Sequence, residues 1–119
     1  NVSAQTTAFN QIKQGMRACV TRSNGTSNKY WSSKPYVTYA KTGTAEDYTG
    51  TGKTDYPNHL QIGYIQADEN SEPIVAFACV AIRQTVASDN SSSSAPYISQ
   101  AIVDEYVKKY GLNWKKASN

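Results

Sequence analysis

The chain has 119 residues, which is enough for one domain, or part of one, with a modest core. Its net charge is only +3 and the excess is spread along the sequence. In the one dense basic cluster, at the C-terminus, no stacking aromatic residues interleave in a repeat. No nucleic-acid partner is therefore expected. No apolar run reaches transmembrane length and no secretory signal is present. Because the sequence starts at Asn1 without Met, we expect a processed or partial chain.

Two cysteines, Cys19 and Cys79, are too few for a disulfide framework. Both lie in apolar periodic segments, which favours two buried thiols over a single disulfide bond. Neither has a His or another Cys at metal-ligand spacing, so we expect no metal and no cofactor.

Residues 3–20 predict a helix with one apolar stripe facing the core, formed by Ala8, Phe9, Ile12, Met16, Cys19 and Val20. Gly15 costs about 1 kcal/mol relative to Ala inside a helix, and its presence suggests close packing at that point. Residues 21–35 predict a connection rich in turn-forming residues. Tyr30 and Trp31 should attach this connection to the body of the protein.

Residues 36–46 predict the first strand, and they contain the run Lys41-Thr42-Gly43-Thr44. Alternation places Lys41 and Gly43 on one face, together with Val37 and Tyr39, and it places Thr38, Thr42 and Thr44 on the other face. Gly43 is a poor strand former, and the usual reason for such a glycine is the close approach of another backbone or of a ligand.

Three further elements follow. After a polar loop at 47–58, residues 59–67 predict a second strand and residues 68–72 an acidic turn. Residues 74–84 are apolar on both faces, which predicts a third strand covered on both sides. After a polar loop at 85–94, residues 95–110 predict a helix that ends at Gly111 and buries Ile98, Ala101, Ile102, Tyr106 and Tyr110. The expected fold class is α+β, a three-stranded antiparallel meander with an N-terminal and a C-terminal helix.

The run Lys41-Thr42-Gly43-Thr44 is the most informative stretch, because Lys-Thr-Gly on a strand is the third signature of the serine acyl-transferases that react with penicillin. From Phe9 to about Tyr110 the chain resembles the C-terminal end of the transpeptidase domain of class B penicillin-binding proteins. The resemblance extends to Ile12–Met16, Ala45-Glu46, Ile62-Gly63-Tyr64 and Ser94–Ile98. Ala40 departs from it, since the family often has glycine there. The resemblance implies that residues 1–119 are the C-terminal portion of such a domain, with the penicillin-binding and serine β-lactamase-like fold.

The family works with three motifs, and this sequence contains one of them. No lysine has a serine three residues before it, so the Ser-x-x-Lys nucleophile motif is missing. Ser88-Asp89-Asn90 has the letters of the second motif, but it follows Lys-Thr-Gly instead of preceding it, and we interpret it as coincidence. Gly52-Lys53-Thr54 is not a phosphate-binding loop, because Asp47 stands where that loop needs glycine. His59, the only histidine, is interpreted as an ordinary polar residue at a strand end.

The resemblance also implies roles for the four motif residues in a peptidoglycan D,D-transpeptidase, which cross-links stem peptides through an acyl-serine and binds β-lactams. Lys41 and Thr44 would be catalytic, Lys41 through its positive charge and Thr44 through a backbone N–H in the oxyanion hole. Thr42 and Thr44 would bind the substrate carboxylate. Gly43 would let the substrate lie against the strand.

The implied partners are peptidoglycan stem peptides, β-lactam antibiotics and the rest of the transpeptidase domain. Without that remainder, the isolated chain is expected to be inactive and to self-associate through residues 74–84 or an uncovered sheet face. The implied location is the extracytoplasmic face of the bacterial cell membrane, with an anchor outside this chain. Two alternatives stay open: a β-lactamase or penicillin sensor of the same fold, and a non-catalytic binding module with a coincidental motif.

Overall fold

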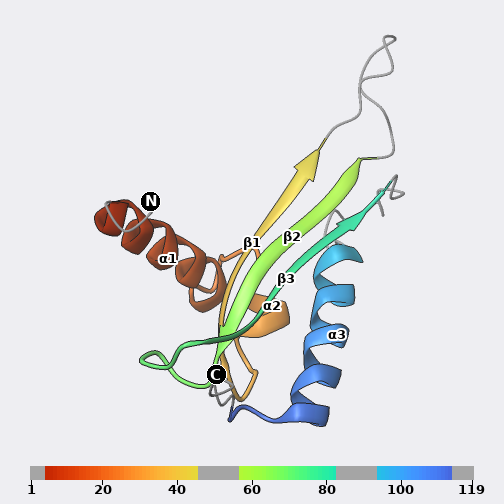
Figure 1. Cartoon of the computed structure of the whole chain (residues 1–119). Helices are drawn as coiled ribbons and strands as arrows, with labels where there is room; N and C mark the ends of the chain where they lie inside the picture. Colours follow the sequence, from red (N-terminus) through yellow and green to blue (C-terminus); the bar gives the residue numbers. More distant parts are fainter. Residues whose placement is uncertain (1–4, 46–56, 83–93, 114–119) are drawn as a thin grey trace, which may run out of the picture.

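Three antiparallel strands form the centre of the protein in the computed structural model, which describes residues 5–45, 57–82 and 94–113. The strands are β1 (Val37–Ala45), β2 (Asn58–Gln66) and β3 (Pro73–Ala81). Helices α1 (Thr6–Thr21) and α3 (Ser94–Tyr110) lie on opposite sides of the sheet (Figure 1). The α+β meander with two terminal helices is thus confirmed. The expected connection at 21–35 contains a short additional helix, α2 (Asn28–Trp31).

The strands pair in the order β1-β2-β3, so β1 and β3 each have one edge without a partner strand among the described residues. The register places Lys41 opposite Ile62, Thr42 opposite Gln61 and Thr44 opposite His59. Within the described ranges, no helix is both long and apolar enough to cross a membrane.

Gly63 is required by the close approach of two neighbours in the sheet. A Cβ atom at this position would lie 2.4 Å from the carbonyl oxygen of Tyr39 and 2.5 Å from Cζ of Phe77. Phe77 in turn stacks on Trp31, with ring centroids 5.1 Å apart. The glycine therefore lets the aromatic core pack directly onto the backbone of β2.

The core joins the sheet to α1, α2 and α3 through buried aromatic and aliphatic side chains: Val20, Tyr30, Trp31, Tyr36, Ala40, Ile65 and Val103. Tyr30 and Trp31 are 3% and 1% exposed, which confirms that they attach the connection to the body of the protein. Gln100 of α3 adds a hydrogen bond from its Nε2 to the carbonyl oxygen of Tyr30, 2.7 Å long.

Asp104 of α3 binds two residues just before β1. The hydroxyl of Tyr36 donates to Oδ1 of Asp104 at 2.8 Å, and Lys34 forms an ion pair with Oδ2. Burial, followed by the hydrogen bond to Asp104, raises the pKa of Tyr36 above its ordinary value. This pairing fixes α3 to the segment that leads into β1.

The two helices bury different side chains from those expected. In α1 only Val20 is buried, whereas Phe9 and Ile12 are 49% and 59% exposed, because the N-terminal half of the helix projects away from the sheet (Figure 1). In α3 the expected buried face is wrong, because Ile98, Ala101, Ile102 and Tyr110 are exposed and Tyr106 is half-buried. The buried residues of α3 are Ala95, Pro96, Ser99 and Val103.

Small residues explain which face of α3 packs against the sheet. Ser99 is buried because its hydroxyl donates to the carbonyl oxygen of Ala95 at 2.8 Å, so no polar group is left without a partner. The short side chains at these two positions let the helix approach the sheet closely. The end of α3 is as predicted, since Gly111 has a φ of 72° and its N–H donates to the carbonyl oxygen of Val107.

The prediction that β3 is covered on both faces is wrong. Helix α3 covers one face, but Ala76, Ala78 and Val80 on the other face are exposed. Gly15 is also not closely packed, since an added methyl group would meet nothing within 4 Å. Both cysteines are free, as favoured, but they are half-buried rather than fully buried.

Two segments singled out in the sequence, Gly52-Lys53-Thr54 and Ser88-Asp89-Asn90, lie outside the described residues.

Candidate active site

The motif residues occupy the second half of β1, an edge strand in the described part of the sheet. Lys41, Gly43 and Thr44 are exposed and Thr42 is half-buried. The α1 side of the strand is identified by Tyr39, whose ring contacts Lys13 and Arg17 of that helix. Strand alternation therefore places Lys41 and Gly43 on the α1 side and Thr42 and Thr44 on the opposite side.

The ammonium group of Lys41 has a backbone partner and no acidic partner in the described ranges. Its Nζ donates to the carbonyl oxygen of Thr42 at 2.5 Å. The side chain is exposed, so the charge is available to a ligand that approaches the α1 side of the strand.

A groove of about 580 Å³ reaches Lys41 from the side of α1. One wall is a helical face of α1 at spacings of three and four residues, with Gln11, Gln14, Gly15 and Ala18, and the other is the turn Asn24–Thr26. Gly15 contributes to the opening, because it has no side chain to fill it. None of the described residues that line the groove is acidic.

The turn after α1 holds its shape through the end of the helix. A Cβ atom at Gly25 would lie 2.2 Å from the carbonyl oxygen of Cys19, so only glycine fits. That same oxygen accepts the N–H of Ser27 at 3.1 Å, and the carbonyl oxygen of Val20 accepts Nδ2 of Asn28 at 2.8 Å. The turn therefore satisfies carbonyl groups that the end of a helix leaves without partners.

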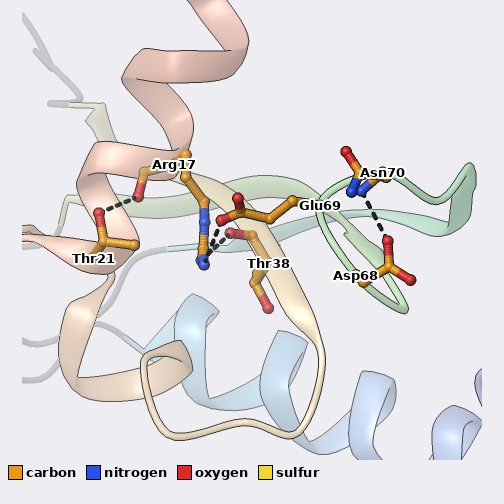
Figure 2. Close-up of polar contacts among 6 residues, drawn as sticks. All are labelled: Arg17, Thr21, Thr38, Asp68, Glu69 and Asn70. Atoms are coloured by element: carbon orange, nitrogen blue, oxygen red, sulfur yellow. Dashed lines mark hydrogen bonds and ion pairs between the residues drawn. The ribbon is translucent and has the colours of Figure 1, made fainter.

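Arg17 attaches α1 to the start of the motif strand (Figure 2). Its Nη1 donates to the carbonyl oxygen of Thr38 at 3.3 Å, and its Nη2 lies 3.5 Å from Oε1 of Glu69 in the β2–β3 turn. The guanidinium also lies over the ring of Tyr39, which stacks on Tyr64 with centroids 4.6 Å apart. The exposed ion pair adds little stability. The contacts with Thr38 and Tyr39 fix the helical wall of the groove against β1.

Polar side chains of β2 lie behind the two threonines of the motif. Gln61, opposite Thr42, is fully buried, and its Nε2 donates to Oγ of Ser27 at 3.4 Å. His59, opposite Thr44, has a buried Nδ1 without a hydrogen-bond partner within the described protein. These residues support the strand from within the fold, and no pattern in the sequence would have identified Gln61.

The segregation of charge is a signal that the sequence analysis missed. The first acidic residue is Glu46, whereas the residues before it include six cations, Lys13, Arg17, Arg22, Lys29, Lys34 and Lys41. The positive charge is therefore not spread along the chain but concentrated in the part that carries α1, the groove and the motif strand.

Residues 1–104 match the profile of a protein family described as penicillin binding protein transpeptidase domain. The matched segment includes the three strands, the groove and α3 as far as Asp104. A search of curated proteins finds no match. Because the family match concerns the segment as a whole, the roles of Lys41, Thr42, Gly43 and Thr44 stay predictions.

Proposed function

Because the chain belongs to the penicillin-binding protein transpeptidase family, we propose that the complete protein is a class B D,D-transpeptidase that cross-links peptidoglycan stem peptides. The observation that carries the proposal is the placement of Lys41-Thr42-Gly43-Thr44 on an exposed edge strand beside a cationic groove. Ala45-Glu46 after the motif favours class B, since class A enzymes and β-lactamases more often diverge at this point. The protein would act on the extracytoplasmic face of the cell membrane, with its anchor outside this chain.

The reaction joins two stem peptides through an ester intermediate. A serine outside this chain forms a bond to the carbonyl carbon of the penultimate D-Ala, the amide C–N bond breaks, and the terminal D-Ala leaves with the proton that the serine gives up. An amine of a neighbouring stem peptide then attacks the ester, forms a new amide bond and returns a proton to the serine oxygen. A β-lactam imitates the dipeptide and stops after the first step.

Lys41 would stabilise the charges that develop in both steps. Its exposed ammonium can interact with an incoming carboxylate and can favour proton transfer from a nearby hydroxyl. In the described structure its partner is the carbonyl oxygen of Thr42, a contact that a substrate or a serine of the second motif can replace.

Thr42, Gly43 and Thr44 would bind the substrate along the strand edge. The threonine hydroxyls can donate to the terminal carboxylate, and the N–H of Thr44 can donate to the oxyanion. Packing among the described residues does not require glycine at position 43, because an added Cβ would lie at ordinary distance, 3.6 Å, from Cβ of Leu60. This supports the close approach of a substrate strand as the reason for Gly43.

Labelling with a fluorescent penicillin tests the proposal. The complete protein should form one covalent adduct on a serine outside residues 1–119, and the isolated chain should form none. An adduct on any serine of the isolated chain, Ser88 included, would contradict the motif assignment. Rapid release of the adduct would instead indicate a β-lactamase, and no adduct on either protein would indicate a non-catalytic module.

A further inference from the structure

We propose that Arg22 and the groove bind a second carboxylate of the peptide substrate, distinct from the terminal carboxylate that Thr42 and Thr44 would hold. The inference rests on the proposed function, because it concerns the same peptide on the same strand. It extends that function by assigning a specificity-determining residue outside the Lys-Thr-Gly motif.

Arg22 and Lys41 differ from the other cations before Glu46 in their surroundings. The others interact with an acid or an aromatic ring: Arg17 with Glu69, Lys34 with Asp104, Lys13 with Tyr39 and Lys29 with Tyr30. In the described structure neither Arg22 nor Lys41 has such a partner, and both line the same groove. Two positive charges that line one groove, with no acid among its described lining residues, attract an anionic ligand.

Hydrogen-bond donors of the groove suit a carboxylate. Besides the two cations, the groove presents the amide groups of Gln14 and Asn24 and the hydroxyl of Thr26. A guanidinium can hold both oxygens of a carboxylate at once, which favours arginine over lysine for this purpose. The groove volume of about 580 Å³ accommodates a peptide side chain with room for water.

The backbone of Arg22 is fixed, so its side chain starts from a defined position. Its N–H donates to the carbonyl oxygen of Ala18 at 3.1 Å, and its own carbonyl oxygen accepts the N–H of Gly25 at 2.8 Å. The side chain itself is exposed. Substitution of the guanidinium therefore leaves the turn and the end of α1 intact.

Strand alternation explains why one peptide would use both sites. A substrate paired with the edge of β1 alternates its own groups between the two faces of the sheet. Its terminal carboxylate would lie on the side of Thr42 and Thr44. An acidic group further along the peptide can then lie on the α1 side, where Lys41 and Arg22 open onto the groove.

The experiment compares two synthetic stem peptides that end in D-Ala–D-Ala and differ only in an upstream carboxylate or carboxamide. In the complete protein, Arg22→Gln should lower kcat/KM about tenfold for the carboxylate peptide and leave the carboxamide peptide unchanged. Arg22→Lys should retain part of the preference in kcat/KM for the carboxylate peptide over the carboxamide peptide. Lys108→Gln, on the exposed surface of α3, is the matched control and should change neither value.

Three outcomes would overturn the inference. An equal effect of Arg22→Gln on both peptides would show that no second carboxylate is recognised. An equal loss in the rate of acylation by penicillin would show that Arg22 binds the terminal carboxylate instead. No effect on either peptide would remove Arg22 from the substrate site. Failure of the proposed function gives a different result, because the wild-type protein would then turn over neither the carboxylate peptide nor the carboxamide peptide.

Discussion

Substitution of Gly63 by alanine tests the packing that holds the motif strand in place. The new methyl group would lie 2.4 Å from the Tyr39 carbonyl oxygen and 2.5 Å from Cζ of Phe77. Phe77 cannot turn away easily, because it stacks on Trp31, which is 1% exposed. Overpacking of this kind costs about 1–3 kcal/mol, and two rigid neighbours place Gly63→Ala near the upper end of that range.

Gly15→Ala is the matched control, and its expected effect on stability is opposite to that of Gly63→Ala. A methyl group there meets nothing within 4 Å, and alanine is the better helix former, so the substitution should stabilise the chain by about 0.5–1 kcal/mol. Urea unfolding of the purified chain, followed by circular dichroism, gives both free energies of unfolding. A free energy of unfolding for Gly63→Ala within about 0.5 kcal/mol of the wild-type value is typical of a surface substitution. That result would refute the close contact of β2 with Tyr39 and Phe77.

Three further predictions concern the site, pH and assembly. Lys41→Ala should slow acylation of the complete protein by penicillin about 100- to 1,000-fold, and Thr44→Ala should do less because its N–H remains; unchanged acylation in Lys41→Ala would remove Lys41 from the site. Because the pKa of Tyr36 is raised on folding, the contribution of Tyr36 to stability should be constant below about pH 10 and fall above it, and Tyr36→Phe should reduce that fall in pH-dependent unfolding experiments. The isolated chain should self-associate through the free edge or uncovered face of β3, and Val80→Lys should prevent this; a wild-type chain that sediments as a monomer at every concentration would contradict the prediction.

The sequence was sufficient to predict the order and type of the main elements, because each has a recognisable hydrophobic pattern. The pairing of β2 with β3 follows from an alternating run, an acidic turn and a run that is apolar on both faces, and the end of α3 follows from Gly111. The motif strand could be placed because Lys41-Thr42-Gly43-Thr44 continues a β-prone segment without a break. Residues close together in the sequence were enough to predict these features.

Contacts between distant segments could not be predicted in the same way. In α3 two stripes have helical spacing, and the more hydrophobic one, with Ile98 and Ile102, is exposed because Ser99 and Val103 allow a closer approach to the sheet. The groove was also missed, since it arises where the face of α1 that contains Gly15 meets a turn that folds back onto Cys19. Hydrophobic periodicity in a sequence predicts which residues share one face of a helix or strand. It does not predict which other element packs against that face.

The ion pair and hydrogen bond at Asp104 also bear on where the polypeptide can be shortened. The family profile ends at that residue, so a truncation guided by it would keep the partner of Lys34 and Tyr36 but would remove Val107 and Leu112. Both of these side chains are half-buried against the core. A cut at the profile boundary would therefore expose the segment that leads into β1. The cut lies far along the chain from the motif that this segment positions. The smallest fragment suited to crystallisation or NMR spectroscopy extends at least to Leu112.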